Sequence, residues 1–485
     1  MTYKTNLRTR RARRASAVFV LAAAAATALP AQTLTTLFTF DQANGGYPEA
    51  ALVQATDGNL YGTTNGFGAN NGGTVFKIST DGTLTTLYNF CSQTGCTDGE
   101  NPTAGLVQAT NGDLYGTTFG GGTTGNGTVF RAGVHSGRLT TIYNFCPKSG
   151  CADGSGPEAG LVQAANGDLY GTTNVGGTQG HAGGSQGDGT VFRMSPRGAL
   201  AATASFNGAD GCGSYAGLVQ ATDGDLYGTT AHCGAFDGGT IFRMSTSGAP
   251  VLLYSFCSQG FPSCTDGSYP WGGALVEASD GNLYGTTSEG GAYAEGTVFS
   301  VTPAGALTTL YSFCAQGLCK DGERPYAGLV QGTDGNLYGT TYYGGAYDSG
   351  TVFKITPAGT LTTLVSFTNG EWPYAGLVQA TDGDFYGTTE FGGASDAGTV
   401  FRLSVGLGPF VKTLPIVGTE GAAVKILGTD LTGATSVTFD GTAAVFDVVS
   451  ATEITATVPS GATTGTVQVV TPGGTLSSNL PFRVL

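Results

Sequence analysis

Leu60-Tyr61-Gly62-Thr63-Thr64 occurs seven times, nearly unchanged, in this chain of 485 residues. The other copies begin at Leu114, Leu169, Leu226, Leu283, Leu337 and, with Phe in the first place, Phe385. Consecutive copies lie 48 to 57 residues apart. A repeat of this length is typical of β-propeller blades and related arrays, in which each repeat forms one small unit that packs on its neighbours. The repeat therefore predicts the architecture, although it leaves the chemistry open.

One repeat, Gly328–Phe367, shows what each unit contains. Leu329–Gln331, Leu337–Thr341, Thr351–Ile355 and Leu361–Phe367 have the apolar, β-branched and aromatic composition of strands, and Gly-containing turns separate them. No stretch shows helical periodicity with capping residues. Four antiparallel strands per unit, arranged around an axis, make a propeller blade. We predict an all-β fold with a seven-bladed β-propeller.

The two ends of the array predict how the ring closes. The seventh repeat runs through its third strand to Leu403 and lacks a fourth. Thr33–Phe40 matches a fourth strand such as Thr83–Phe90, yet no blade precedes it. We predict that strand 33–40 completes blade seven, which removes the open sheet edges of a linear array. The predicted propeller spans residues 32–405.

The recurring pattern also resembles a known family. Gly-Leu-Val-Gln-Ala-x-Asp/Asn-Gly-x-Leu-Tyr-Gly-Thr-Thr, followed by Gly-Thr-Val-Phe-Lys/Arg, is similar to the GloVer (Gloeo/Verruco) tandem repeat of bacterial surface and secreted proteins. The resemblance covers nearly all of Thr33–Leu403. It implies export, and it brings no defined activity and no catalytic residues.

A second domain is predicted over residues 409–485, where the composition changes after Gly406-Leu407-Gly408-Pro409. Short strand-like runs alternate there with Gly, Pro and Asp turns, a spacing that suits an immunoglobulin-like β-sandwich. Val424–Leu431, Val437–Gly441 and Ile454–Pro459 resemble the strands of an IPT/TIG domain. That resemblance implies a spacer or binding module rather than an enzyme.

Residues 1–31 have the pattern of a secretory signal peptide. Five arginines between Arg8 and Arg14 precede the short apolar run Ala15–Leu29 and a small-residue cleavage region. The run is too short to span a membrane. Sec and twin-arginine export both remain open. We expect a secreted, extracellular or cell-surface protein, with the periplasm as a further possibility.

All ten cysteines lie in the repeats. An even cysteine number in an exported chain predicts disulfides. Zinc would require the pairs to converge, whereas pairs one repeat apart belong to separate blades. The expected local pairs, followed by the two cysteines that flank a segment of the fourth repeat, are Cys91 with Cys96, Cys146 with Cys151, Cys257 with Cys264, Cys314 with Cys319, and Cys212 with Cys233.

The charge balance restricts the partners. The chain carries 20 Lys+Arg and 34 Asp+Glu, and removal of the basic leader makes it more acidic still. Such a surface repels nucleic acid and anionic membranes. We therefore expect no nucleic-acid partner. No second apolar run of membrane-spanning length follows the leader, so we expect no membrane insertion, and we also expect a monomer.

Candidate ligand-binding residues lie in two kinds of variable loop, the fourth-to-first connections and the second-to-third loops, which share one rim of a propeller. Aromatic rings stack on sugar faces and carboxylates accept sugar hydroxyls, so this mixture favours a polysaccharide or envelope glycan. The competing interpretation is that the acids cap turns and the aromatics pack between loops. The candidates are Trp372, Tyr342, Tyr343, Tyr347, Tyr293, Phe391, Glu371, Glu323, Asp321 and Glu289.

Catalytic and metal motifs are weak. A catalytic carboxylate pair is normally unique, whereas Asp-Gly recurs at Asp98, Asp153, Asp266 and Asp321. The Asp-Gly-Asn/Asp turns lack the spaced ligands of a calcium loop. We predict no catalytic residues, no metal and no cofactor.

The functional prediction is a secreted, non-catalytic binding or surface protein that recognises a glycan on the loop-rich propeller face. One alternative is a propeller glycoside hydrolase or polysaccharide lyase that uses rim carboxylates. The other is a scaffold or adhesin with no small ligand.

Overall fold

The computed structural model describes residues 32–134, 137–179, 187–368 and 370–485. The predicted leader, residues 1–31, lies outside the described residues. Within the described residues no helix is long and apolar enough to cross a membrane.

The first six blades are four-stranded sheets whose strands follow one another in chain order. All strand pairs in them are antiparallel, as in β2–β3 and β3–β4. Their strands are β2 (Val53–Gln54), β3 (Leu60–Thr64), β4 (Thr74–Ile78), β5 (Leu84–Asn89); β6 (Val107–Gln108), β7 (Leu114–Thr118), β8 (Thr128–Ala132), β9 (Leu139–Asn144); β10 (Val162–Gln163), β11 (Leu169–Thr173), β12 (Thr190–Met194), β13 (Leu200–Ser205); β14 (Val219–Gln220), β15 (Leu226–Thr230), β16 (Thr240–Met244), β17 (Val251–Ser255); β18 (Val276–Glu277), β19 (Leu283–Thr287), β20 (Thr297–Val301), β21 (Leu307–Ser312); and β22 (Val330–Gln331), β23 (Leu337–Thr341), β24 (Thr351–Ile355), β25 (Leu361–Ser366).

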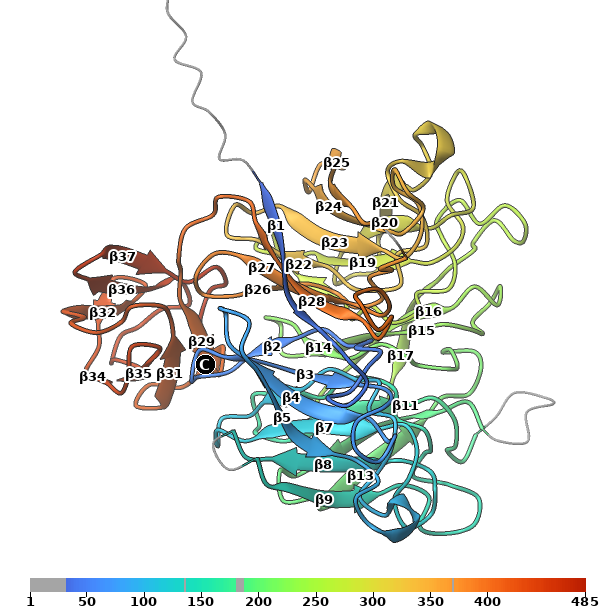
Figure 1. Ribbon diagram of the computed structural model, residues 1–485, viewed down its shortest axis with the longest axis horizontal. Helices are drawn as coiled ribbons and strands as arrows, with labels where there is room; N and C mark the ends of the chain where they lie inside the picture. Colours follow the sequence, from blue (N-terminus) through green and yellow to red (C-terminus); the bar gives the residue numbers. More distant parts are fainter. Residues whose placement is uncertain (1–31, 135–136, 180–186, 369) are drawn as a thin grey trace, which may run out of the picture.

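The seventh blade combines the two ends of the array. It contains β26 (Val378–Gln379), β27 (Phe385–Thr389) and β28 (Thr399–Ser404), and its outer strand is β1 (Thr33–Thr39). β1 pairs antiparallel with β28 from Thr33↔Ser404 to Thr39↔Thr399 (Figure 1). The seven-bladed propeller predicted by the repeats is thus the observed fold, and its seventh sheet joins residues from the two ends of the array.

The contacts of the Leu-Tyr-Gly-Thr-Thr strand explain why this sequence recurs in every blade. In β3 every residue is buried. A Cβ on Gly62 would lie 2.6 Å from the Phe76 ring, so only glycine fits there. The Tyr61 hydroxyl donates to Asp57 at 2.8 Å, and Thr63 Oγ1 donates at 3.0 Å to the carbonyl of Ala104 in the next blade. Each position therefore serves packing within a blade or contact between blades.

A ring of side-chain amides also links neighbouring blades. Gln108 Oε1 of blade two accepts from the backbone N–H of Thr56 in blade one at 2.9 Å. The same bond recurs around the ring, and Gln54 closes it by accepting from Thr381 N at 2.9 Å. Blade five carries Glu277 in this place, which accepts from Thr222 N at 2.8 Å. These bonds cross the seam between the last and first blades in the same way as every other seam.

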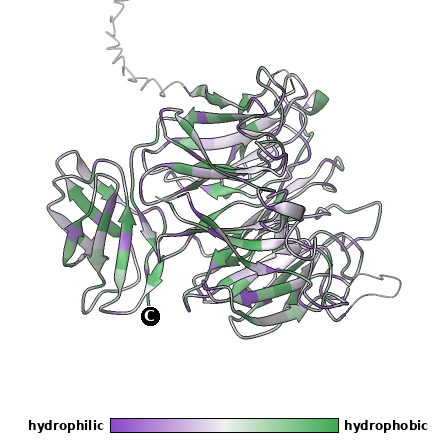
Figure 2. Ribbon diagram, turned by 60° about the horizontal axis from the view of Figure 1, so that its bottom comes forward, coloured by the Kyte–Doolittle hydropathy of each residue, from purple (hydrophilic) through white to green (hydrophobic). Residues whose placement is uncertain are grey.

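The tail forms a two-sheet sandwich, as predicted. One sheet has the order β29 (Lys412–Leu414), β31 (Ala423–Leu427), β35 (Glu453–Thr457), β34 (Phe446–Val448), and the other β33 (Thr442–Ala443), β32 (Ser436–Phe439), β36 (Val467–Thr471), β37 (Gly474–Ser477), with a short parallel pair of β30 (Val417–Gly418) and β38 (Arg483–Val484). Ile426, Phe439, Ile454 and Val469 are buried in its core. Figure 2 shows the hydrophobic residues along the strands of both domains.

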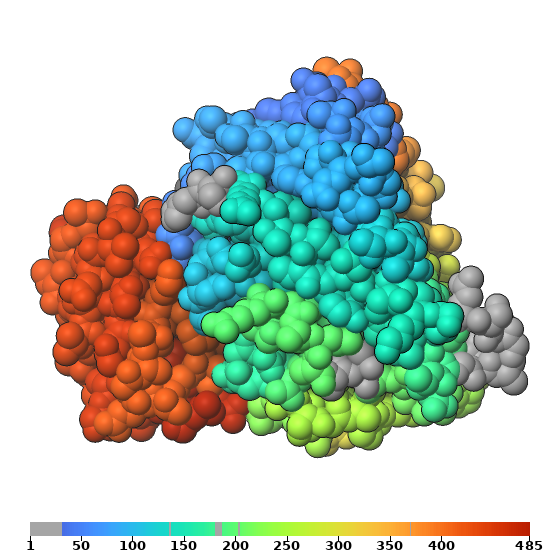
Figure 3. Space-filling model, turned by 90° about the horizontal axis from the view of Figure 1, so that it is seen from below, coloured from blue at the N-terminus to red at the C-terminus, as the bar shows by residue number. Residues whose placement is uncertain are grey.

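The two faces of the propeller differ. We call the face with the second-to-third loops and the fourth-to-first connections the upper face, and the face with the first-to-second turns the lower face. The tail domain lies against the lower face (Figure 1), and the space-filling view shows direct contact between the two domains (Figure 3). The upper face, with the short 3₁₀ turns η1 (Thr94–Cys96) and η2 (Gly317–Cys319), is left without a covering domain among the described residues.

Candidate binding site at the mouth of the central channel

A cavity lies on the propeller axis. Its volume is about 450 Å³, and equivalent inner-strand residues of all seven blades line it. The leucines of the repeated Ala/Gly-Leu-Val sequence, from Leu52 of blade one to Leu377 of blade seven, form one layer of the wall. Pockets of this size bind small molecules in many proteins.

One position per blade gives the upper mouth of this channel its chemistry. It lies just before the inner strand, immediately ahead of a short Ala- and Gly-rich stretch, where the fourth-to-first connection reaches the axis. Unlike the flanking sequence, it differs between blades. Around the ring the seven residues are Glu49, Thr103, Glu158, Tyr215, Trp271, Tyr326 and Tyr374. We call them the mouth residues.

The aromatic side chains occupy one continuous arc of the mouth. Tyr215 and Trp271 stack with ring centroids 4.5 Å apart and planes 9° apart. The Trp271 indole N–H donates to the Tyr374 hydroxyl at 3.1 Å, and the rings of Tyr326 and Tyr374 lie 5.5 Å apart. All four are half-buried, so each keeps part of its surface open. Stacking and the indole hydrogen bond hold these rings in fixed orientations.

Carboxylates form the other part of the mouth. Asn65 donates to Glu49 at 2.7 Å, and Asn174 donates to Glu158 at 3.1 Å. In each case the partner follows the Leu-Tyr-Gly-Thr-Thr strand of the same blade. Burial raises the pKa of Glu49 above its usual range, and the bond from Asn65 opposes this. Burial, with a smaller contribution from Glu49, likewise raises the pKa of Glu158.

Glu390 joins this group from the second-to-third loop of blade seven. Burial raises its pKa to about 7; the hydrogen bond from Tyr342 Oη, at 2.9 Å, opposes the rise and the charge of Glu49 adds to it. A carboxyl group with this pKa exchanges protons near neutral pH. The mouth therefore combines stacked aromatic rings with carboxyl groups whose pKa values are raised by burial.

Four of the residues predicted from the loops lie together beside the mouth. The Tyr342 ring lies 4.6 Å from that of Tyr343 and 6.1 Å from that of Trp372. Trp372 contacts Phe391 at 5.5 Å. Tyr342 also lies 5.4 Å from the mouth residue Tyr326, which joins this cluster to the channel. These four candidates thus lie together beside the mouth, and their role in ligand binding stays a prediction.

The other predicted residues are placed differently. Tyr293 and Tyr347 are exposed at loop tips, at 53% and 64%, and stack on no described ring. Glu371 accepts from the Thr368 backbone N–H at 3.2 Å, and burial raises its pKa. Burial and the charges of nearby Glu295 and Asp348 also raise the pKa of Glu323. Glu289 is half-buried, and its backbone pairs with that of Ser268.

Asp321 is corrected from binding residue to structural residue. Its exposed fraction is 0%. It accepts from the Tyr311 hydroxyl at 2.8 Å and from the backbone N–H groups of Ala315 and Gln316 at 2.9 and 3.1 Å. Both oxygens are occupied by protein donors, so a ligand cannot reach them. The equivalent carboxylates accept in the same way from the tyrosines of their own blades: Asp98 from Tyr88, Asp153 from Tyr143, and Asp266 from Tyr254.

The ten cysteines form the five disulfides that the sequence predicted. Four join cysteines five or seven positions apart within one upper-face loop, and the fifth spans 21 positions of the fourth repeat. No cysteine is free among the described residues. The bonded pairs are Cys91 with Cys96, Cys146 with Cys151, Cys257 with Cys264, Cys314 with Cys319, and Cys212 with Cys233.

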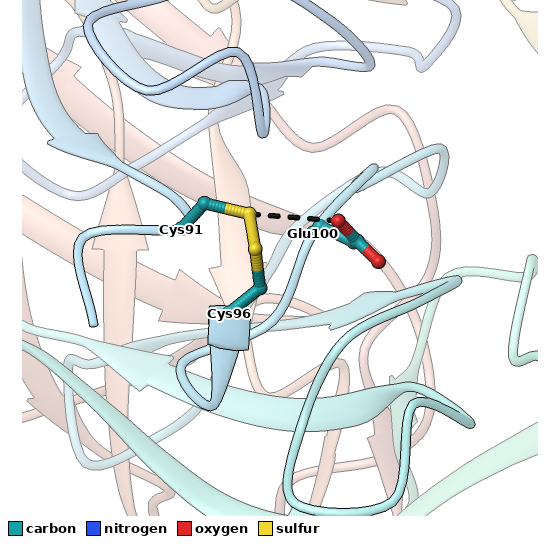
Figure 4. A group of neighbouring side chains, drawn as sticks. All are labelled: Cys91, Cys96 and Glu100. Carbon is teal, nitrogen blue, oxygen red and sulfur yellow. Dashed lines mark hydrogen bonds between the residues drawn. A yellow bond between two sulfur atoms is a disulfide. The ribbon is translucent and has the colours of Figure 1, made fainter. Parts of the chain in front are cut away.

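Two of these disulfides have a glutamate nearby, in an arrangement that could suggest a metal site. Glu100 lies beside Cys91–Cys96, and Glu323 lies beside Cys314–Cys319. Figure 4 shows the first, in which Cys91 Sγ lies 3.5 Å from Glu100 Oε2. Because the sulfurs are bonded to each other, neither can act as a thiolate ligand.

The mouth residues themselves were not among the sequence-based candidates. Their signal was available, since one position in the otherwise constant Ala/Gly-Leu-Val-Gln frame takes residues of different chemistry from blade to blade. Taken one at a time these residues have no motif. Only the ring brings them together.

Comparison with known proteins now identifies the family. The profile described as the Gloeobacter/Verrucomicrobia repeat matches residues 23–182, 95–263 and 258–444. The chain belongs to this repeat family. An IPT/TIG domain matches residues 410–484, in agreement with the predicted tail domain. No curated protein matches the chain in sequence.

Solved structures agree on the fold alone. A streptogramin B lyase superposes with a TM-score of 0.51 at 15% identity, covering 77% of this chain and 97% of that one. A virginiamycin B lyase from Staphylococcus aureus gives 0.50 at 14% identity, covering 77% and 99%. A fungal alcohol oxidase of the AA5 family, in complex with copper, gives 0.52 at 12% identity, covering 93% and 98%. At such identities the likeness extends to the fold and not to the activity.

Proposed function

We propose that this Gloeobacter/Verrucomicrobia repeat protein binds a neutral glycan at the upper mouth of its central channel, without catalysing a reaction. The observation that carries the proposal is the mouth itself, in which Tyr215, Trp271, Tyr326 and Tyr374 face a cavity of about 450 Å³ shared with Glu49 and Glu158. Aromatic faces pack against the C–H faces of sugars, and carboxyl groups accept or donate hydrogen bonds to sugar hydroxyls. Preformed pockets with few polar groups are typical of small-molecule sites.

The charges favour a neutral sugar over an acidic one. Among the described residues that line the cavity there is no Lys, Arg or His. Glu49, Glu158 and the neighbouring Glu390 would repel a uronate or a sulfated sugar. The same absence of a cation argues against polysaccharide lyase chemistry, which must neutralise a substrate carboxylate.

Binding outside the cytoplasm is part of the proposal. Five disulfides are typical of proteins that fold in an oxidising compartment. The signal-peptide pattern of residues 1–31 points the same way. We propose a secreted or surface-exposed protein that meets glycans of its own envelope or of its surroundings.

Glycan-array screening followed by calorimetric titration tests the proposal. Trp271→Ala should weaken binding of an array-positive neutral oligosaccharide about 10- to 100-fold, as expected for loss of a central aromatic contact. Tyr293→Ala is the matched control, because Tyr293 is an exposed aromatic residue outside the mouth. Failure of every glycan to bind, or equal affinities of Trp271→Ala and the parent protein, would contradict the proposal.

Glycoside hydrolysis is the second candidate, and the pKa of Glu390 is the observation that favours it. A carboxyl group with a pKa of about 7 can donate a proton at neutral pH, as a general acid must. Release of reducing ends from a bound neutral oligosaccharide, lost in Glu390→Gln while binding is kept, would favour the enzyme. Binding with no release of reducing ends would favour the non-catalytic protein.

A further inference from the structure

The tail domain contacts the lower rim of the propeller, around the same channel. Thr452 Oγ1 donates at 2.9 Å to the carbonyl of Thr56 in blade one. Thr429 and Thr381 of blade seven share a hydroxyl hydrogen bond of 3.0 Å. Both propeller residues lie just after the inner strands β2 and β26, at the lower rim.

Further contacts extend across the lower rim. Lys412 Nζ donates to the carbonyl of Gln379, the last residue of β26. The guanidinium of Arg483 lies over Gly224 of blade four, where a Cβ would be 3.3 Å from Nη1. The turn of blade three around Gly167 and tail residues around Pro415 line one common groove. The tail thus reaches blades one, three, four and seven, which lie on opposite sides of the axis, and a body that does so covers the lower opening.

The upper mouth instead continues sideways along an aromatic path. From Tyr342 beside the mouth, ring contacts run to Trp372 and then to Phe391. They continue to Tyr47 at 5.1 Å and from there to Phe67 at 5.0 Å. All five rings are half-buried, so each presents some surface. We call Trp372, Phe391, Tyr47 and Phe67 the aromatic track; it crosses blades seven and one.

From this arrangement we propose that the protein recognises the chain end of a linear neutral glycan. This inference rests on the proposed function. A chain cannot thread through a channel that is closed below, so only its terminal units enter the mouth. The following units leave over the aromatic track, where successive rings support successive sugar faces. The channel wall below the mouth is built from Ala, Gly, Leu and Val residues of the inner strands and the residues just before them.

Binding stoichiometry tests chain-end recognition. The probes are a short and a much longer fraction of each of three linear neutral glycans: amylose, unsubstituted β-1,4-xylan and β-1,4-mannan. For a fraction that binds, end recognition predicts one protein per chain whatever its length, measured by calorimetric titration. A protein that grips the middle of a chain would bind in numbers proportional to chain length.

Variants separate the mouth from the track. Trp372→Ala should weaken binding of the bound glycan's hexasaccharide about tenfold and leave its disaccharide unchanged, whereas Trp271→Ala should weaken both. Phe391→Ala provides an independent change in the track should Trp372→Ala fold poorly, and Tyr293→Ala serves as the control.

The outcomes distinguish the two proposals. Stoichiometry that rises with chain length, or equal loss of both oligosaccharides in Trp372→Ala and Phe391→Ala, overturns end recognition and leaves glycan binding in place. Absence of binding to every fraction and every array glycan overturns the proposed function, and end recognition with it.

Discussion

Two groups of carboxyl residues on the upper face differ in how often they recur among the blades and in their surroundings. Asp321 and its equivalents recur in four blades at one loop position, and each accepts a hydrogen bond from a tyrosine of its own blade. Glu49, Glu158 and Glu390 have no counterparts in most blades, they lie at or beside the channel mouth, and burial raises the pKa of each. In a repeat protein, a residue that recurs from repeat to repeat stabilises the single repeat. A residue that differs between repeats can instead contribute to a site formed by the whole ring.

The largest expected effect follows from the recurring group. Asp321→Ala leaves the Tyr311 hydroxyl and two backbone N–H groups without their acceptor, so we expect a loss of about 3 kcal/mol of unfolding free energy. Chemical denaturation measures it. Glu323→Ala, two residues away on the same loop, is the matched control and should cost much less. A stable Asp321→Ala that loses glycan binding would reverse the assignment of the two groups.

A smaller loss of unfolding free energy is expected between blades seven and one, where the ring closes. The group concerned is the glutamine side-chain amide that recurs between neighbouring blades. Gln54 accepts from Thr381 N at 2.9 Å and donates to Thr381 Oγ1 at 3.2 Å, so Gln54→Ala should lower the unfolding free energy by about 2 kcal/mol.

Gln163→Ala breaks the equivalent bond to Thr110 N, 2.8 Å, between blades that are consecutive in the chain. Both variants should lose stability without losing glycan affinity. If Gln54→Ala were neutral while Gln163→Ala was destabilising, the closure between blades seven and one would contribute little to stability.

The architecture could be predicted from sequence because each blade repeats the same short sequence features. The glycine of each Leu-Tyr-Gly-Thr-Thr strand, the Asp-Gly turns and the unpaired strand at Thr33–Phe40 together indicate both the blade and its closure. The disulfides followed from their recurring slots. Aromatic residues in variable loops are conspicuous in the sequence, so Trp372 and Phe391 were among the candidates, and their role in binding stays a prediction.

The mouth could not be predicted by the same logic. Glu49, Tyr215 and Trp271 lie far apart in the chain, and each occupies one variable place in an otherwise constant frame. Their common property is distance from the axis, which becomes visible only when the equivalent positions of all seven repeats are compared. Asp321 was a poor candidate for a different reason. An acidic residue in a loop suggests ligand binding, but Asp321 is buried and accepts hydrogen bonds from three donors of the protein itself.

The third effect is a change in pH dependence. The pKa of Glu390 rises from 4.5 to about 7 on folding, so the folded state binds more protons than the unfolded state between these values. Stability should therefore fall as pH increases from about 4.5 to about 7 and then level off for this group. Glu390→Gln should flatten that part of the curve of melting temperature against pH. An unchanged curve would mean that Glu390 is not the buried acid of the mouth.

The smallest expected effect separates variation that matters from variation that does not. Tyr293 lies in a variable loop, as Trp372 does, but it is 53% exposed at the loop tip and stacks on no described ring. Tyr293→Ala should therefore change the unfolding free energy by less than about 0.5 kcal/mol and leave glycan affinity unchanged. Denaturation and titration of this one variant check both. A marked loss of affinity would show that the binding surface extends to the loop tips of blade five, and that difference between blades, without proximity to the axis, is enough to mark a functional residue.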